Sequence, residues 1–281
     1  MLIAVVLVLS ILVSALWCVG NGTFQSLAWL WQLPVGIVSM FVIQAVLIFL
    51  VVWILSKTIN LEKEQEEDSK FFRWMLGVLD EAAHTILMMR VHTKGLEKVP
   101  TDTRFLLVCN HQHLSDVGVL ISCFKKSKIA FISKQENRTM PVIGKIMHMT
   151  SSQTLDREDD RQALRVILKC IQLVKDGEVS MAVFPEGTRS KDGKVHAFRN
   201  GCFKIAQKAN VPIVVCTING TNQLFHNLKK LKTTHIDLHL VDVIQPEELK
   251  GKTTAEIGDR VYEMMIADLG EEFRMEVVQN T

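Results

Sequence analysis

A histidine and an aspartate follow a short apolar run at a spacing that suits acid–base chemistry. The run Phe105–Cys109 fits a buried strand, and His111 and Asp116 come after it with four residues between them. Sites in open α/β sheets gather just beyond the carboxyl ends of strands. A neutral imidazole there can take a proton from a hydroxyl, while a carboxylate fixes its tautomer and stabilises the imidazolium. The pair predicts a general base, although a histidine at a strand end can also make a purely structural contact.

A metal site is the alternative interpretation of the same loop. His111, His113 and Asp116 could be ligands, and metallo-hydrolase loops of the form His-x-His-x-Asp-His look superficially similar. In this chain Asp116 comes one residue too late, and Val117 stands where the third histidine would be. No further cluster of His, Cys or carboxylates completes a coordination shell. We therefore expect no metal, and a structural role for His113.

A second candidate motif, Phe184–Ser190, also follows an apolar run directly. Its sequence is Phe-Pro-Glu-Gly-Thr-Arg-Ser. Gly187 permits close approach of the backbone to a ligand, and Arg189 can hold a phosphate through two hydrogen bonds. The nucleotide-binding pattern GxxxxGK[ST] is absent from the motif. The motif predicts an anion-binding turn, although an ordinary polar turn with an exposed arginine has the same composition.

The elements that must position these residues alternate between strand-like and helix-like patterns. Asp159–Asp176 has apolar residues at helical spacing, acids at its start and Gly177 at its end. This alternation predicts an α/β domain with a largely parallel, mixed sheet flanked by helices. Shorter helices are expected at Gly201–Ala209 and Thr253–Leu269, and strands at Arg104–Cys109, Lys128–Ile132, Val179–Phe184, Ile213–Ile218 and His235–Val243.

The N-terminal part differs sharply in composition, because no acidic or basic residue precedes Lys57. Two apolar runs, Leu2–Val19 and Leu33–Leu55, predict a hairpin of two membrane helices, of which the second is clearly long enough to span. A cleaved signal peptide is the alternative for the first run, but Met1-Leu2-Ile3 lacks the basic start of such peptides. A hairpin that spans the bilayer and one that enters a single leaflet fit equally well.

These patterns divide the chain into a hairpin (1–56), a linker with an amphipathic helix (57–89) and a catalytic domain (90–281). The amphipathic stretch Phe71–Met89 fits either a core helix or a helix on a membrane surface. The six cysteines form no CxxC pair, which favours a reducing compartment. The net charge of +2, with dispersed basic residues, argues against nucleic acid as a partner.

Together the two motifs resemble the lysophosphatidic acid acyltransferase family, the PlsC-type glycerolipid acyltransferases. That family has a His-x4-Asp block followed by a Phe-Pro-Glu-Gly-Thr-Arg block, in this order and at similar separation. The likeness extends from about His92 to Gly220 and includes Ser133-Lys134-Gln135-Glu136 as a further block. The chain departs from the family at Asn137, where a leucine is usual, and at Val215, where a second proline is common.

The resemblance implies a role for each matched residue and a glycerolipid acyltransferase-like fold. His111 would deprotonate the lysolipid hydroxyl, and Asp116 would orient the imidazole. Arg189 and Lys134 would hold the acceptor's phosphate. The pocket for this phosphate would be shaped by the remaining matched residues, Glu186, Gly187 and Thr188.

The resemblance also implies substrates and a location. A lysophospholipid, 1-acylglycerol-3-phosphate, would receive an acyl group from acyl-CoA or acyl-carrier protein and become phosphatidic acid. No further cofactor is implied, and the catalytic domain would lie at the cytosolic face of a membrane. The departures leave other acceptors open: another lysophospholipid, a lyso-aminolipid or glycerol 3-phosphate. A membrane protein that binds phospholipid without catalysis is a third hypothesis, which the intact His-Asp pair disfavours.

Overall fold

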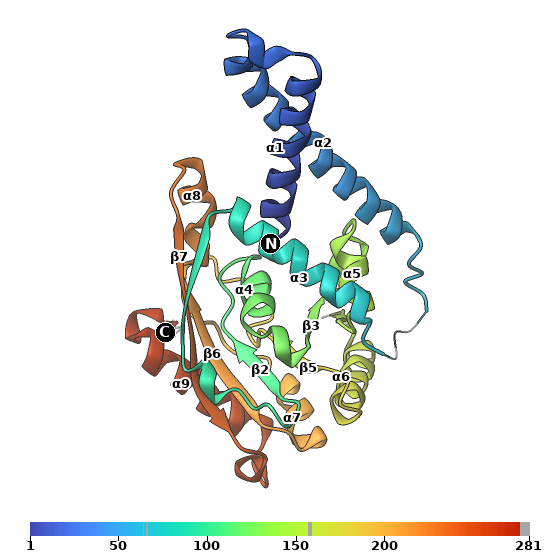
Figure 1. Cartoon of the computed structure of the whole chain (residues 1–281). Helices are drawn as coiled ribbons and strands as arrows, with labels where there is room; N and C mark the ends of the chain where they lie inside the picture. The colour runs from blue at the N-terminus through green and yellow to red at the C-terminus, as the bar shows by residue number, and fades with distance from the viewer. Residues whose placement is uncertain (64, 66, 157–158, 276–281) are drawn as a thin grey trace.

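The structure, a computed structural model, describes residues 1–63, 65, 67–156 and 159–275. A seven-stranded sheet in the order β1-β7-β6-β2-β5-β3-β4 forms its centre (Figure 1). Neighbouring strands are parallel except β6 and β7, which are antiparallel. The predicted α/β fold with a largely parallel, mixed sheet is therefore confirmed. The strands are β1 (Met89–Lys94), β2 (Leu106–Cys109), β3 (Ile129–Lys134), β4 (Gln153–Leu155), β5 (Ser180–Val183), β6 (Ile213–Asn219) and β7 (Thr234–Ile244).

Helices cover both faces of the sheet, so the central strands are buried on both sides. In β2, Leu106 and Val108 point to one face, whereas Leu107 and Cys109 point to the other. The first face packs against α6 (Asp160–Lys175), α7 (Lys204–Ala209) and α9 (Thr254–Leu269). The second face packs against α4 (Asp116–Cys123), and α3 (Lys70–Ile86) lies over α4 and α5 (Ile143–Met149).

Local sequence signals account for where the longer helices begin. The side chain of Asp159 accepts hydrogen bonds from the backbone N–H groups of Arg161 and Gln162 at the start of α6. Thr253 and Glu256 form a reciprocal capping box at the start of α9. Both helices match their predicted ranges to within a residue at each end. The predicted stretch Gly201–Ala209 is helical, but its first turn is a 3₁₀-helix, Asn200–Phe203.

The N-terminal hairpin consists of α1 (Leu2–Gly20) and α2 (Trp29–Lys57), both long and apolar enough to cross a membrane. It projects from one end of the globular part (Figure 1). Small and polar side chains lie between the two helices: a Cβ at Gly36 would be 3.2 Å from the side chain of Ser14, and Gln44 donates to Ser10 at 3.0 Å. Small residues of this kind allow membrane helices to approach closely.

The end of α2 rests on the globular part through a small apolar cluster. Val52 packs with Met75 and Leu76 of α3 and with Ile146 of α5. The same helix α3 exposes Phe71 and Trp74 on its other side. One side of the helix is therefore core, as the first alternative predicts, and the membrane-surface alternative stays a prediction for the exposed side. The helix ends at Ile86, earlier than predicted, because β1 begins at Met89.

The remaining helix, α8 (Leu224–Lys229), lies between β6 and β7. Figure 1 places it at the end of the molecule from which the hairpin projects. The last six residues of the predicted catalytic domain, 276–281, lie outside the described residues.

Candidate active site

The two candidate motifs meet because they follow neighbouring strands of the sheet. Strands β2 and β5 are parallel, with Val108 opposite Val183. The loop after each strand therefore begins at the same edge. Two backbone contacts join the loops directly: the N–H of Ser190 donates to the carbonyl of His111 at 2.8 Å, and the His111 N–H donates to Glu186 at 2.8 Å.

His111 and Asp116 form the pair that their spacing predicts. Oδ2 of Asp116 lies 2.7 Å from Nδ1 of His111. The same oxygen accepts the backbone N–H groups of Gln112 and His113, at 2.7 and 2.8 Å. The carboxylate is fully buried at the first position of α4, where the helix dipole favours a negative charge. With Nδ1 turned to the carboxylate, Nε2 is the nitrogen left to take a proton.

The imidazole of His111 also packs against an aromatic ring. Its ring stacks on Phe184, with 4.0 Å between ring centroids and an angle of 14° between the planes. The side chain of His111 is 14% exposed, so a small part of it can be reached from solvent. A base on this rigid support keeps its orientation without a large entropic cost at each turnover.

Glu186 joins two loops through hydrogen bonds. It is buried; one carboxylate oxygen accepts the N–H of His111, and the other accepts the N–H of His196 at 2.9 Å. Burial raises the pKa of Glu186 to about 7. Both oxygens accept backbone N–H groups, which agrees with the predicted role of Glu186 in shaping a pocket. Direct contact between Glu186 and phosphate is not needed for that role.

The turn after Glu186 brings its glycine against a cationic side chain. Gly187 has a φ of 73°, and a Cβ there would lie 3.0 Å from both Cδ and Nε of Arg199. Thr188 and Arg189 are exposed, and Arg189 forms no ion pair with a described residue. Arg189 is therefore placed to meet an anion from solvent, and Arg199 is a neighbouring cation that sequence reasoning missed.

Lys134, the last residue of β3, lies at the same edge of the sheet, because β3 pairs in parallel with β5. Its ammonium group is 2.5 Å from a carboxylate oxygen of Glu136, and both side chains are more than half exposed. An exposed pair of this kind contributes little stability and exchanges readily. Phosphate binding by Lys134, as predicted from the resemblance, requires that exchange.

Two amides that received no role from the sequence fix the loop that carries His111 to β6. The side chain of Asn110 both accepts from the N–H and donates to the carbonyl of Ile218, at 2.8 and 2.9 Å. Gln112 accepts the N–H of Gly220 at 3.1 Å. The signal for these contacts in the sequence was the position of both amides directly after an apolar strand. Amides that are buried there must find hydrogen-bond partners.

The contacts of the His113 ring favour a structural role. Its ring contacts Phe225 of α8 edge-on, and Nδ1 is 3.0 Å from the hydroxyl of Ser115. Burial lowers the pKa of His113 from its ordinary value, which favours the neutral ring at pH 7. Among the described residues, no group of three or more His, Cys, Asp or Glu side chains could hold a metal ion.

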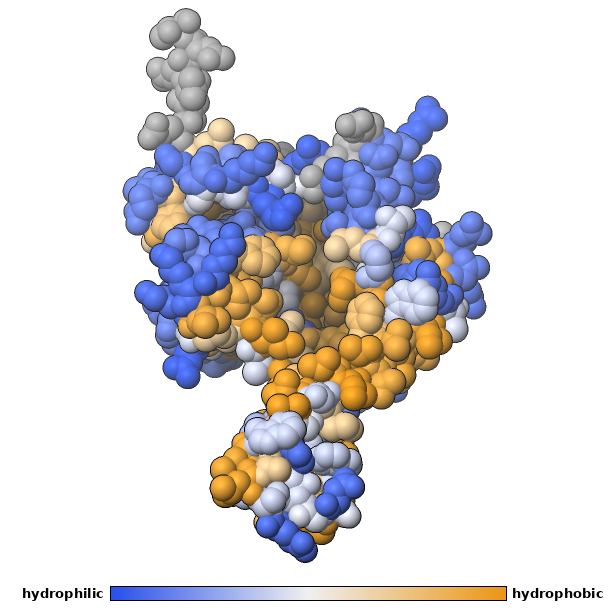
Figure 2. Space-filling model, turned by 90° about the horizontal axis from the view of Figure 1, so that it is seen from above, coloured by the Kyte–Doolittle hydropathy of each residue, from blue (hydrophilic) through white to orange (hydrophobic). Residues whose placement is uncertain are grey.

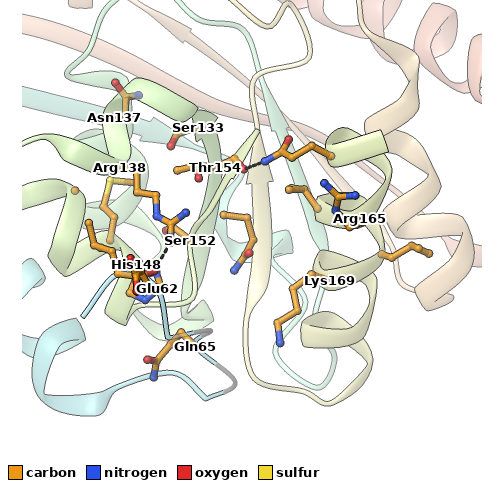
Figure 3. A pocket seen from close by; sticks show the side chains of 17 residues that line it. Glu62, Gln65, Ser133, Asn137, Arg138, His148, Ser152, Thr154, Arg165 and Lys169 are labelled. Atoms are coloured by element: carbon orange, nitrogen blue, oxygen red, sulfur yellow. Dashed lines mark hydrogen bonds between the residues drawn. The ribbon is translucent and has the colours of Figure 1, made fainter. Parts of the chain in front are cut away.

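A cavity of 580 Å³ lies beside β3 and β4, the last two strands in the sheet order (Figure 3). None of the predicted site residues lines it. Arg138 and His148 lie on one wall, and Arg165 and Lys169 of α6 lie on the opposite one. Asn137, one of the two departures from the family pattern, also lines this cavity.

Part of the chain is similar to a known protein family. Residues 90–219 match the family described as Acyltransferase. The chloroplastic 1-acyl-sn-glycerol-3-phosphate acyltransferases of Brassica napus and Arabidopsis thaliana are each 39% identical, over 149 and 136 residues. These alignments cover 53% and 48% of this chain and 42% and 37% of those proteins. The chain thus spans less than half the length of these relatives.

A solved structure is similar in fold. The PlsC protein of Thermotoga maritima, a 1-acyl-sn-glycerophosphate acyltransferase, superposes with a TM-score of 0.59 and 28% identity. The match covers 73% of this chain and 81% of that one. The fold is therefore similar to that of a known acyltransferase. Residues 90–219, less than half of the chain, are thus similar to the acyltransferase family.

Proposed function

We propose that the protein transfers an acyl group from a thioester donor to the free sn-2 hydroxyl of 1-acylglycerol-3-phosphate, giving phosphatidic acid. The observation that carries the proposal is the buried His111–Asp116 pair beside the Phe184–Ser190 loop. The names of the relatives from Brassica napus and Arabidopsis thaliana support the choice of acceptor.

The proposed reaction uses His111 as a general base. Nε2 removes the proton of the lysolipid hydroxyl while its oxygen attacks the thioester carbonyl. Asp116, buried beside Nδ1, stabilises the imidazolium that forms. When the tetrahedral intermediate collapses, the carbon–sulfur bond breaks and the imidazolium returns the proton to the departing thiolate. The reaction is balanced without a redox partner, and the donor is acyl-CoA or acyl-carrier protein.

Acceptor recognition is assigned to the loop after β5. Arg189, exposed at the mouth of the site, would pair with the acceptor's phosphate, assisted by Lys134 from β3. Thr188 would add a hydroxyl. Glu186 and Gly187 would hold the shape of the loop, since one braces it and the other permits its left-handed turn.

Attachment to a membrane surface would give the protein access to both substrates, the lysolipid and the thioester donor. The two apolar N-terminal helices indicate that the protein is attached to a membrane, where a lysolipid with a long acyl tail resides. A thioester donor is carried in water. We place the catalytic domain at the cytosolic face, where the donor reaches it.

The test is acyl transfer by the full chain in detergent micelles. Labelled acyl-CoA and acyl-carrier protein are each supplied with 1-acylglycerol-3-phosphate, and label is sought in phosphatidic acid. Label with wild type and none with His111→Ala supports both reaction and base. Transfer only to another lysophospholipid, a lyso-aminolipid or glycerol 3-phosphate would correct the acceptor. No transfer to any acceptor would overturn the enzyme proposal in favour of lipid binding alone.

A further inference from the structure

The segment that contains α8 combines exposed apolar and basic side chains. Phe225 is 58% exposed and Leu231 is 80% exposed. Three lysines, Lys229, Lys230 and Lys232, are exposed as well, and none forms an ion pair with a described residue. No Asp or Glu occurs between Thr221 and Asp237. This surface, residues 224–233, is called the α8 tip below.

The backbone of the tip holds Leu231 outward in an unfavourable conformation. The turn after α8 has the Schellman pattern: the Leu231 N–H donates to the carbonyl of Leu228, and the Lys232 N–H donates to that of Asn227. The residue at the position of Leu231 usually is glycine, because its φ is positive. Here a leucine has a φ of 52°. A bulky apolar side chain is thus presented to solvent where a glycine would fit better.

The tip lies at the end of the molecule that carries the hairpin. Figure 1 shows both at the same end. Figure 2 looks down on this end and shows apolar surface running from the hairpin across the domain, with hydrophilic surface beside it and a hollow in the middle. The tip also contacts the loop that carries His111, because the ring of Phe225 lies 5.0 Å from the ring of His113, two residues after His111.

We propose that the α8 tip is a second membrane contact, which docks on anionic lipid headgroups and holds the loop of the base at the bilayer surface. Exposed aromatic and leucine side chains enter the interface, and lysines beside them attract an anionic leaflet. No acidic or basic side chain precedes Lys57 in the hairpin, whereas the tip carries three exposed lysines. The inference rests on the membrane attachment proposed above.

The test places an environment-sensitive fluorophore on the tip of the full chain. Thr233→Cys, next to the tip's lysines, is labelled, and unsubstituted protein is the blank for native thiols. Lys250→Cys is the control position: it is exposed and lies beyond the far end of β7, an eleven-residue strand that begins at the tip. At about 3.3 Å per residue, the strand separates the two positions by roughly 35 Å.

The labelled proteins are reconstituted in phosphatidylcholine vesicles with and without phosphatidylserine. We expect a blue shift, and quenching by nitroxide-labelled lipid, at position 233 in the anionic vesicles, and neither at position 250. Replacing all three tip lysines by glutamine should weaken this docking by up to about a hundredfold. Leu231→Gly, which suits the positive φ and should fold at least as well, should also weaken it.

The measurements distinguish failure of the membrane attachment from failure of the docking. Protein that does not float with the vesicles would overturn the membrane attachment, whereas floating protein with a water-exposed position 233 would overturn the docking alone. An equal response in phosphatidylcholine vesicles would overturn the role of anionic lipid. Because the readout is fluorescence, it holds even if no acyl transfer is found.

Discussion

The carboxylate of Asp116 places one oxygen 2.7 Å from Nδ1 of His111, while its other oxygen is buried and has no hydrogen-bond partner among the described residues. Three N–H donors, one of them the imidazole, thus converge on a single oxygen. This arrangement fixes which ring nitrogen is free, and the proposed role of His111 depends on it.

Removing either member of the pair should abolish most turnover without unfolding the protein. We expect His111→Ala and Asp116→Asn to lower kcat by about 10²- to 10⁴-fold, because general-base assistance and the correct tautomer are lost. The measurement is acyl transfer, with thermal unfolding of each variant alongside. His113→Ala is the matched control, since it removes a neighbouring ring that faces α8. A similar loss in that control would argue for damage to the loop.

Arg189 should act on the acceptor and leave the donor unaffected. A charge-assisted hydrogen bond is worth about 1.5–3 kcal/mol, so Arg189→Ala should raise the acceptor's KM by roughly 10- to 100-fold. The KM of each substrate is measured with the other saturating. Lys191→Ala, an exposed cation two residues along, should change neither. If the donor's KM rises instead, the phosphate pocket is wrongly assigned.

The sequence was sufficient to predict that each candidate motif directly follows a buried strand. Short apolar runs of β2 and β5 are recognisable because both faces of a central parallel strand are buried, and the polar motifs begin directly after them. Parallel strands direct their carboxyl ends to one edge, but the sequence did not reveal that β2 and β5 are direct neighbours.

The direction of individual charged side chains could not be predicted in the same way. Arg73 stands between aromatic residues in an amphipathic stretch and fits a membrane surface by pattern. In the structure it turns inward to Asp68 and to two backbone carbonyls, those of Ile129 and Thr150. These partners are distant in sequence, and periodicity within one helix does not reveal them.

Arg73 should therefore matter for stability. Its guanidinium lies 2.6 Å from the fully buried carboxylate of Asp68, with both oxygens of that carboxylate engaged. Arg73→Met leaves a buried charge unpaired and should lower the free energy of unfolding by about 3–5 kcal/mol. Denaturant unfolding in detergent measures this. Arg90→Met, at an exposed position, should change it by less than about 0.5 kcal/mol. An equally small effect at Arg73 would mean that the pair is solvated.

Glu186 should make stability depend on pH in a defined window. Burial raises its pKa from the ordinary 4.5 to about 7, so between these values the folded state holds a proton that the unfolded state has lost. The free energy of unfolding should therefore fall as pH rises from about 4.5 to about 7, and this contribution should be constant above that range. At about 1.4 kcal/mol for each pH unit, the fall attributable to this carboxyl is roughly 3 kcal/mol.

The variant Glu186→Gln isolates this contribution from those of other titrating groups. It keeps the size of the side chain but cannot ionise, and its NH₂ faces a backbone N–H where the native oxygen accepts one. We expect lower stability at every pH and a flatter profile between pH 4.5 and about 7. Denaturant unfolding of both proteins across this range gives the difference between the two slopes. Parallel profiles would show that Glu186 is already ionised throughout, held so by the two amides that it accepts.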